Sequence, residues 1–429
     1  IVLVSAFFIE SLNTNPAFPE LQLSNTTAKS GMEPINTSLS EEELASQIQK
    51  TKPSPIIQEN MGLLNKTQIA SKQEVYGFYV NWDEKSKTSF KNNIHSITTL
   101  VPEWLQLTSS LTLEDSTDNS IVAEAKEHDV KILPLVNNFI DNKWDGDILH
   151  QLFTTPGAED RFIKNLLAYV RTNGFDGINI DFEEINQKDK AHFTRFMNKV
   201  SKAFHQHDLM VTVDVPPNNN SFDYASLATS VDRMFVMLYD QHHAMSKPGP
   251  IAPSDWIKEN LQQLDIPSEK LIVSLGNYGY DWEENSNQPA DAMTFGDITN
   301  LGIKINPKIH WNKEAGNPYL RYKKNGKKHI VWFLDAATFY NQMKLSIDSG
   351  SKGIAVWRLG SEDPAIWNYI NKPKEIDNPS NALKTLINSD PVHYTGAGEI
   401  LKIVSQSEKG KRTIRLDSHG LIEAETYVK

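Results

Sequence analysis

The fold is decided by residues 174–184, whose sequence is GFDGINIDFEE. After Gly177, apolar side chains alternate with three polar ones, Asn179, Asp181 and Glu183. Successive side chains of a β-strand point to opposite faces, so the three polar groups share one face and the apolar groups the other. An amide and two carboxyl groups are costly to bury without partners. Polar residues toward the end of an otherwise apolar strand predict the active site of an α/β barrel, and the alternative is a hydrogen-bonded cluster that only sets the strand register.

The sequence around this strand alternates short apolar runs with amphipathic stretches. Gly174 follows one of the amphipathic stretches, where a helix C-terminal glycine is expected. Continuous apolar strands separated by helices predict a parallel sheet covered on both faces, and eight of them predict a (β/α)8 TIM barrel. The expected strands are 75–82, 95–107, 130–137, 175–183, 209–215, 233–240, 271–277 and 352–358. The expected helices are 113–128, 158–172, 188–207, 252–264 and 335–349.

Residues 283–334 are too long for a simple loop before the last barrel strand. They predict a small β-rich insertion, with one strand at 303–310 and a hairpin of 319–322 and 329–332. The hairpin is expected to turn at Asn325-Gly326, because Asn-Gly favours the turn conformation that matches strand twist.

The segments outside the barrel differ from it in composition. Residues 73–375 are expected to form the barrel domain, and residues 10–72, rich in Asn, Ser, Thr and Pro, are expected to be a disordered linker. The apolar residues 1–9 are too few to cross a bilayer, and we expect them to be the remnant of a truncated signal or anchor segment. Residues 376–429 are expected to form a linker and a β-hairpin of 398–404 and 411–416 that leads to a missing downstream region.

Composition excludes several classes of function. The 429 residues carry a net charge of −11, which argues against a nucleic-acid partner. The sequence contains no cysteine, so disulfides, thiolate metal sites and a cysteine nucleophile are excluded. We find no phosphate-binding glycine loop and no G-x-S-x-G nucleophile motif. We therefore expect no metal and no cofactor.

Four segments together resemble a known family. Residues 176–183, DGINIDFE, resemble the D-G-x-D-x-D-x-E signature of glycoside hydrolase family 18, the chitinase-like family, with Asn179 where the first inner Asp is usual. Residues 237–240, MLYD, resemble the family's M-x-Y-D strand end. Residues 353–357, GIAVW, resemble its last barrel strand, and residues 76–82 resemble its first. The resemblance extends over residues 73–372 and keeps the family's order.

The resemblance implies a substrate-assisted retaining glycosidase. Glu183 is then the acid and base, and Asp181 binds the N–H of the substrate's 2-acetamido group, whose oxygen attacks the anomeric carbon. Tyr239 is expected to donate its hydroxyl to that oxygen. The residues expected to bind substrate are Asn179, Met237, Asp240, Trp357, Tyr79 and Trp82. Core packing remains the alternative for each aromatic residue near a strand end, including Trp104, Tyr278, Tyr280 and Trp282.

The resemblance also implies a substrate and a setting. The hairpin before the last strand resembles the bacterial branch that includes spore-cortex peptidoglycan N-acetylglucosaminidases. The expected partner is an N-acetylhexosamine-containing glycan outside the cytoplasm, reached by a secreted or membrane-anchored protein at the bacterial cell surface. The order of segments resembles proteins that join such a barrel to a deacetylase and a glycosyltransferase. Residues 135–139 stand where many chitinases carry a Ser-x-Gly-Gly turn, and their bulk is expected to reshape the floor of the sugar site, which disfavours crystalline chitin.

Two other functions stay open on the sequence. One is a non-catalytic glycan-binding barrel, against which the presence of Glu183 argues. The other is a metal-dependent barrel enzyme that uses Asp181, Glu183 and Glu184, although Glu184 is expected to point away from Glu183 on a regular strand.

Overall fold

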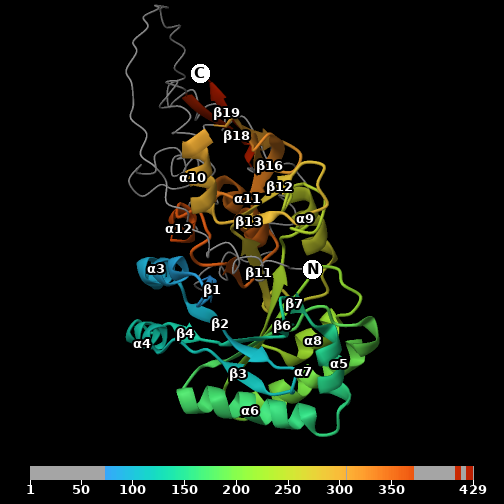
Figure 1. The fold of residues 1–429 in the computed structure, drawn as a ribbon. Coiled ribbons are helices and arrows are strands. Elements are labelled where there is room, and N and C mark those ends of the chain that lie inside the picture. The colour runs from blue at the N-terminus through green and yellow to red at the C-terminus, as the bar shows by residue number, and fades with distance from the viewer. Residues whose placement is uncertain (1–72, 306, 372–410, 417–421, 429) are drawn as a thin grey trace, which may run out of the picture.

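The computed structural model describes residues 73–305, 307–371, 411–416 and 422–428 (Figure 1). Residues 1–72 and 372–410 lie outside this part, and so do the predictions of an anchor remnant, a linker and a strand at 398–404. No helix of the described part is long and apolar enough to cross a membrane.

Eight parallel strands close into a barrel. Each strand pairs with the next along the chain, and β1 pairs with both β2 and β17, so that the sheet has no open edge at this point. This closure confirms the predicted (β/α)8 barrel. Its strands are β1 (Glu74–Tyr79), β2 (Thr99–Leu107), β5 (Leu135–Asn137), β8 (Gly177–Asp181), β9 (Met210–Val215), β10 (Arg233–Met237), β11 (Leu271–Gly276) and β17 (Gly353–Trp357). A short strand, β4 (Lys131–Ile132), pairs with β2 ahead of β5.

Helices surround the barrel (Figure 1). The predicted helices after 158, 188, 252 and 335 are confirmed as α6 (Ala158–Asn173), α7 (Lys190–His205), α9 (Ser254–Gln263) and α11 (Ala336–Asp348). Gly174 ends α6 with φ of 63°, the left-handed conformation that glycine adopts without strain. Further helices and helical turns are α3 (Glu84–Asn93), η2 (Ile94–Ser96), α5 (Gly146–Thr154), η3 (Gln187–Asp189), α8 (Tyr224–Ser230) and α12 (Ile366–Ile370).

The helix predicted over 113–128 is wrong at its start. Residues at its beginning form β3 (Leu113–Asp115), which pairs antiparallel with β2, and the helix α4 begins later (Asn119–Glu127). The Asp118 carboxylate accepts hydrogen bonds from the backbone N–H groups of Ser120 and Ile121. Asp118 is thus an N-cap, and the helix starts after it because the cap satisfies its first free N–H groups.

The insertion before the last strand is larger than predicted. It is a five-stranded antiparallel sheet in the order β13-β12-β16-β15-β14. Its strands are β12 (Gly279–Glu283), β13 (Asp291–Met293), β14 (Ile309–Asn312), β15 (Asn317–Lys324) and β16 (Lys327–Phe333). The predicted turn is confirmed, because β15 and β16 meet at Asn325 and Gly326, whose φ angles are 53° and 80°.

The strand predicted at 303–310 is wrong in its first half. Residues up to 305 belong to a helix, α10 (Phe295–Ile305), and the strand β14 begins at Ile309. The Asp297 carboxylate accepts from the Thr294 N–H at 2.9 Å, and the Thr294 hydroxyl accepts from the Asp297 N–H at 3.1 Å. This reciprocal capping box starts the helix and overrides the strand-like apolar residues that follow it.

Two further hairpins complete the described part. A hairpin of β6 (Phe139–Ile140) and β7 (Lys143–Trp144) follows β5 directly. Near the end of the chain, β18 (Lys411–Leu416) pairs with β19 (Ile422–Val428). The predicted strand 411–416 is confirmed and pairs with β19, while the predicted strand 398–404 lies outside the described residues.

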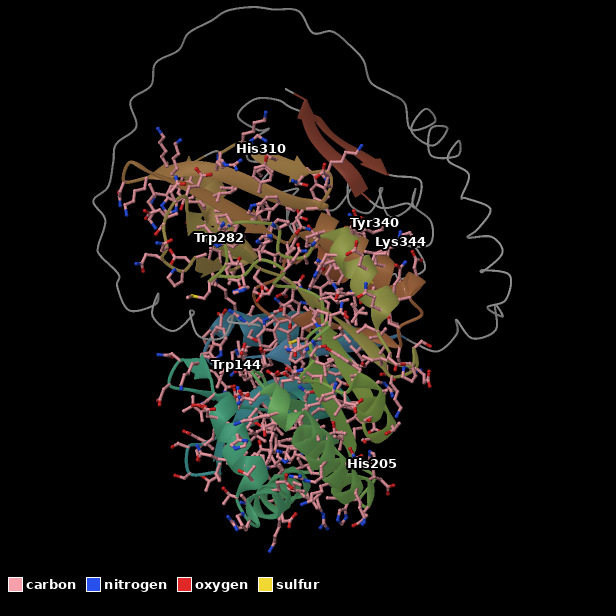
Figure 2. All side chains as sticks on the ribbon, turned by 90° about the vertical axis from the view of Figure 1, so that its right-hand side faces the viewer. Trp144, His205, Trp282, His310, Tyr340 and Lys344 are labelled. Carbon is pink, nitrogen blue, oxygen red and sulfur yellow. The ribbon has the colours of Figure 1, made fainter. Side chains whose placement is uncertain are left out.

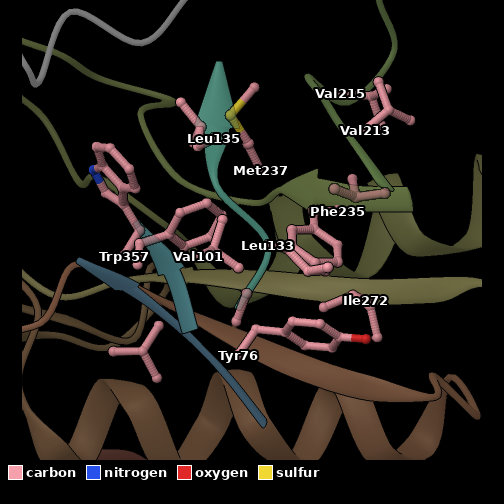
Figure 3. Close-up of a cluster of buried hydrophobic side chains, with 14 of the residues drawn as sticks. Tyr76, Val101, Leu133, Leu135, Val213, Val215, Phe235, Met237, Ile272 and Trp357 are labelled. Carbon is pink, nitrogen blue, oxygen red and sulfur yellow. The ribbon is translucent and has the colours of Figure 1, made fainter. Parts of the chain in front are cut away.

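The barrel interior is packed with aromatic side chains. Figure 3 shows Tyr76, Phe235 and Trp357 in one cluster of buried apolar side chains. The rings of Tyr76 and Phe235 lie 4.7 Å apart, and those of Phe78 and Trp357 lie 5.1 Å apart in an edge-to-face arrangement. These contacts fill the barrel, so the space left for a ligand lies above them, at the C-terminal ends of the strands.

Candidate active site

A pocket opens at the C-terminal ends of the barrel strands. It encloses about 240 Å³, counting its mouth, and is lined by Phe78, Trp144, Asp181, Glu183, Asp214, Met237, Tyr239 and Trp357. These residues come from or directly follow β1, β7, β8, β9, β10 and β17. Three acids and a tyrosine thus meet a wall of apolar and aromatic side chains, which is the composition expected of a small-ligand site.

Strand β8 presents its polar face to this pocket, as predicted. Ile178, Ile180 and Phe182 are fully buried on the other face, where the Phe182 ring stacks on Phe196 of α7 with centroids 5.6 Å apart. Asp181 and Glu183 line the pocket and are each 5% exposed. Helix packing on one face therefore holds the two carboxyl groups on the other.

The backbone of Glu183 is clamped by Asn138. The Glu183 N–H donates to the Asn138 side-chain oxygen at 2.9 Å, and the Asn138 amide donates to the Glu183 carbonyl at 3.0 Å. Asn138 is fully buried and does not line the pocket. The segment 135–139, which we expected to reshape the pocket floor by its bulk, therefore braces the acid from behind. Sequence reasoning missed this role because the two residues are far apart in the chain.

Asp214 is a pocket residue that the sequence analysis did not identify. It lies on β9, is 3% exposed, and faces the same space as Asp181 and Glu183. The signal was present in the strand sequence MVTVDV, in which Thr212 and Asp214 alternate with valines in the manner of β8. Reading every barrel strand for inward polar residues would have found it.

Asn179, predicted to bind substrate, lies below the pocket. Its amide nitrogen donates to Asp214 Oδ2 at 2.6 Å, and its oxygen accepts from the Thr212 hydroxyl at 2.5 Å. The side chain is fully buried and is not among the residues lining the pocket. Its hydrogen bonds run across to Thr212 and Asp214 on β9.

Met237, Tyr239 and Trp357 all line the pocket, as their predicted roles require. Burial raises the pKa of the Tyr239 hydroxyl well above its usual range, and the nearby carboxyl groups of Asp214 and Asp181 raise it further. The hydroxyl is therefore protonated at all physiological pH values and is available as a hydrogen-bond donor.

Asp240 lies just beyond Tyr239 but outside the pocket lining. Its carboxyl group accepts hydrogen bonds from the hydroxyl groups of Tyr278 at 2.5 Å and Tyr280 at 3.2 Å. Burial raises the pKa of Asp240 to about 7, and the two tyrosine hydroxyls only partly oppose this. This position fits a support for the Tyr239 segment, whereas the sequence analysis expected Asp240 to bind substrate.

The two aromatic residues predicted on the first strand segment also lie outside the pocket lining. Tyr79 is 2% exposed, and its hydroxyl donates to Asp118, the cap of α4. Its neighbour Phe78 faces the pocket instead, because adjacent strand residues point to opposite faces. The Arg358 guanidinium lies over the Trp82 ring, 4.2 Å from the ring centroid. The indole N–H of Trp82 donates to the Glu103 carboxylate at 3.4 Å.

The other aromatic residues that the sequence analysis placed near strand ends are core residues. Trp104, Tyr278, Tyr280 and Trp282 are each at most 3% exposed. Trp144, on the β6–β7 hairpin, lines the pocket although the sequence analysis did not single it out. Figure 2 shows Trp144 on the barrel side of the molecule and Trp282 on the insertion side.

Three acids at this end of the barrel have raised pKa values. Burial raises the pKa of Asp181 well above its usual range, and Asp214 and Glu103 add to the effect. Burial likewise raises the pKa of Asp214, although the Asn179 hydrogen bond opposes it. Burial raises the pKa of Glu103, on β2, to about 7. Buried acids with shifted pKa values in a pocket are typical of catalytic sites.

The metal-dependent alternative finds no site in the described ranges. No group of three or more His, Asp or Glu side chains there is arranged to hold a metal ion. Glu184, the third acid of that alternative, is exposed and begins the loop after β8 with φ of 52°.

Comparison with known proteins decides the family. The model of "Glycosyl hydrolases family 18" matches residues 74–363. The chain belongs to glycoside hydrolase family 18. It is therefore a glycosidase of the class that acts on N-acetylglucosamine-containing glycans, and the family predicted from residues 176–183 is confirmed.

Several curated relatives of this family-18 glycosidase come from Bacillus. The uncharacterized glycosylase YvbX of Bacillus subtilis is 29% identical over 58% of this chain and 76% of its own length. The putative sporulation-specific glycosylase YdhD of Bacillus subtilis is 27% identical over 56% of this chain and 60% of its own length. The cortical fragment-lytic enzyme of Bacillus anthracis is 26% identical over 60% of this chain and 64% of its own length. The chain thus spans less than two thirds of the latter two relatives.

Solved structures of a chitinase and of a spore cortex-lytic enzyme share the fold. A chitinase from Chromobacterium violaceum superposes with a TM-score of 0.65 at 24% identity, over 70% of this chain and 98% of that one. The spore cortex-lytic enzyme SleL of Bacillus cereus superposes with a TM-score of 0.64 at 23% identity, over 70% of this chain and 74% of that one. At these identities the likeness establishes the fold.

Proposed function

We propose that this family-18 glycosidase cleaves β-linked N-acetylglucosamine chains by a substrate-assisted mechanism with retention of configuration. One observation carries the proposal: Asp181, Glu183 and Tyr239 line a single pocket whose wall includes Trp357. This chemistry needs a carboxylic acid to protonate the leaving group, a second carboxyl group to bind an amide N–H, a hydroxyl donor and an aromatic face.

In the first step, Glu183 transfers its proton to the glycosidic oxygen, and the bond between this oxygen and the anomeric carbon breaks. The acetamido oxygen of the same sugar forms a new bond to the anomeric carbon and gives an oxazolinium ion. Glu183 is well placed as the acid because Asn138 holds its backbone by two hydrogen bonds. An acid held in place in this way contributes roughly 10²–10⁴-fold to the rate.

The acetamido group is held from two sides. Asp181 Oδ1 is buried and has no hydrogen-bond partner among the described residues, so it is available to accept the acetamido N–H. Tyr239 donates its hydroxyl to the acetamido oxygen and holds it toward the anomeric carbon. Trp357 and Met237 then cover the apolar face of the sugar ring.

In the second step, water attacks the anomeric carbon on the face that the leaving group vacated. Glu183, now a carboxylate, accepts a proton from this water, and the carbon–oxygen bond of the oxazolinium ion breaks. Two inversions at the anomeric carbon leave its configuration unchanged.

Peptidoglycan-type glycan is the substrate class that we favour. Two relatives bear the name cortical fragment-lytic enzyme or sporulation-specific glycosylase, and SleL is named as a spore cortex-lytic enzyme. We further propose that the protein acts outside the cytoplasm, where such glycans lie. Fractionation of cells that express the complete protein tests this placement, and recovery of the protein only in the cytoplasm would contradict it.

The activity is tested with a panel of β-linked N-acetylglucosamine oligomers, purified peptidoglycan and fully deacetylated oligomers. The wild-type protein should release products from the acetylated substrates with the β configuration, as followed by ¹H NMR, and Glu183→Gln should not. Hydrolysis of the deacetylated oligomers at an undiminished rate would rule out participation of the acetamido group.

A further inference from the structure

Strands β8 and β9 present two levels of polar side chains to the barrel interior. Their register pairs Asn179 with Thr212 and Ile180 with Val213. Continued by one residue, it places Asp181 level with Asp214. Neighbouring strands lie about 4.8 Å apart, so the two carboxyl groups are neighbours above an amide and a hydroxyl.

The lower level fixes the orientation of the Asn179 amide. The Thr212 hydroxyl donates to Asn179 Oδ1 at 2.5 Å, and the Asn179 nitrogen donates to Asp214 Oδ2 at 2.6 Å. An amide nitrogen only donates, so Asp214 Oδ2 must accept whether or not Asp214 is ionised. The carbonyl oxygen of a protonated carboxyl group accepts better than its hydroxyl oxygen, so a proton on Asp214 is favoured on the other oxygen, Oδ1.

The upper level holds two oxygen atoms that have no hydrogen-bond partner within the described part of the chain. Asp181 Oδ1 and Asp214 Oδ1 are both buried and neither has a hydrogen-bond partner, while both residues line the pocket. Leaving a buried polar atom unpaired is costly, and two negative charges at neighbouring positions repel each other. A single proton held between the two carboxyl groups relieves both costs.

We propose that Asp214 is a positioning residue that shares one proton with Asp181 and so replaces the aspartate that the family signature carries at position 179. The proposal rests on the function proposed above. Before the reaction the proton lies on Asp181. When positive charge develops on the acetamido group, the O–H bond of Asp181 breaks and an O–H bond forms on Asp214 Oδ1, which leaves a carboxylate facing the oxazolinium ion. No proton enters or leaves the pocket in this transfer.

Other ionisable groups around the pair favour a shared proton. Glu183 faces it from the end of β8, Tyr239 from the end of β10, and Glu103 acts on Asp181 from β2. Burial and these acids raise the pKa of both aspartates. Removing the charge of Asp214 should therefore lower the pKa at which Asp181 loses its proton.

The kinetic test uses Asp214→Asn, which keeps the shape and the acceptor for Asn179 but cannot hold the proton. On an N-acetylglucosamine oligomer we expect kcat to fall about 10- to 100-fold, with KM within about twofold. The alkaline limb of the pH profile should move to lower pH. The double variant N179D/D214N returns the carboxyl group to β8 and should recover the position of this limb and part of kcat.

The matched control is Asp232→Asn. Asp232 lies before β10 at the other end of the barrel, where its carboxylate accepts from the Val211 N–H of β9 at 2.8 Å. This variant removes an aspartate bonded to the same strand and should leave kcat and the pH profile unchanged.

A second measurement does not depend on turnover. In protein labelled with ¹³C at the aspartate carboxyl groups, the Asp181 resonance, assigned with Asp181→Asn, should titrate at lower pH in D214N than in the wild type. An unchanged Asp181 titration together with an unchanged pH profile in D214N would overturn the inference. In that case, loss of activity in Glu183→Gln would still support the proposed function. If the wild-type protein hydrolyses no acetylated glycan, the proposed function fails, and the titration still decides whether the two carboxyl groups share a proton.

Discussion

The two ends of the barrel treat their carboxyl groups in opposite ways, with a half-buried glutamate at one end and buried aspartates at the other. At the N-terminal end, Glu74 of β1 receives two hydrogen bonds from the Arg233 guanidinium, at 2.6 and 2.7 Å, and one from the Tyr76 hydroxyl at 2.8 Å. At the C-terminal end, Asp181 and Asp214 each keep one buried oxygen without a hydrogen-bond partner among the described residues. One end pairs its carboxyl group with a cation, and the other leaves a carboxyl oxygen of each aspartate unpaired within that part of the chain.

The pKa values follow this difference. Burial by itself would raise the pKa of Glu74, but the hydrogen bonds from Arg233 and Tyr76 outweigh it and hold the pKa below its usual range. Burial raises the pKa of Asp181 and Asp214, which contact no Lys or Arg side chain of the described residues. The comparison teaches that burial sets the cost of a charge, whereas the partner decides whether the group keeps its charge or its proton.

The largest expected effect is on catalysis at the C-terminal end. Glu183→Gln should lower kcat by roughly 10²–10⁴-fold, because the amide cannot transfer a proton to the leaving oxygen. Its melting temperature should equal or exceed that of the wild type, since a buried acid is replaced by a neutral group of the same shape. The assay is product release from an N-acetylglucosamine oligomer beside a thermal melt, and a fully active variant would remove Glu183 from the mechanism.

The next effect is on stability at the N-terminal end. Glu74→Gln should lower the free energy of unfolding by about 2 kcal/mol, because Arg233 loses a charged partner that it contacts twice. The kcat should stay at the wild-type value, since the substitution lies at the far end of the strands. Denaturant unfolding and the same product assay measure both, and a large loss of kcat without loss of stability would break the contrast between the two ends.

A smaller effect concerns the pH dependence of stability. The unfolded chain loses the Asp240 proton near pH 4, whereas the folded protein keeps it up to about pH 7. The stability that this proton contributes is therefore fully present below about pH 4 and is lost as the pH rises toward 7. Asp240→Asn should flatten this decline by about 1 kcal/mol per pH unit between pH 5 and 7. Urea unfolding across that range measures the slope, and the same slope in both proteins would contradict a raised pKa.

The smallest expected effect is on substrate affinity at the pocket mouth. Trp144→Ala should raise KM about three- to tenfold while kcat changes little, because the ring supplies contact area and no charge. The control is Tyr79→Phe, which removes only a hydroxyl outside the pocket. Trp282→Ala would not serve, because Trp282 is a core residue. If Trp144→Ala leaves KM unchanged for all oligomer lengths, the β6–β7 hairpin is not part of the sugar site.

Several features of the fold and the site were predictable because their causes are local. The alternation in residues 174–184 predicted which side chains point into the barrel, although Asn179 lies below the pocket that Asp181 and Glu183 line. Asn325-Gly326 predicted the turn between β15 and β16. The helix α10 was missed because its capping box at Thr294 and Asp297 was not recognised, and Asp118 marks a cap that the apolar pattern concealed.

Strand period and capping act over a few neighbouring residues, so the sequence by itself determined the inward face of β8, the barrel and the family. Only the tertiary structure decided the partners of those inward groups. It brought Asn138 behind Glu183, set Asp214 beside Asp181, and turned Tyr79 out of the pocket. The physical reason is that a hydrogen bond or a charge interaction depends on which strand closes against which, and barrel closure joins residues that no local pattern connects.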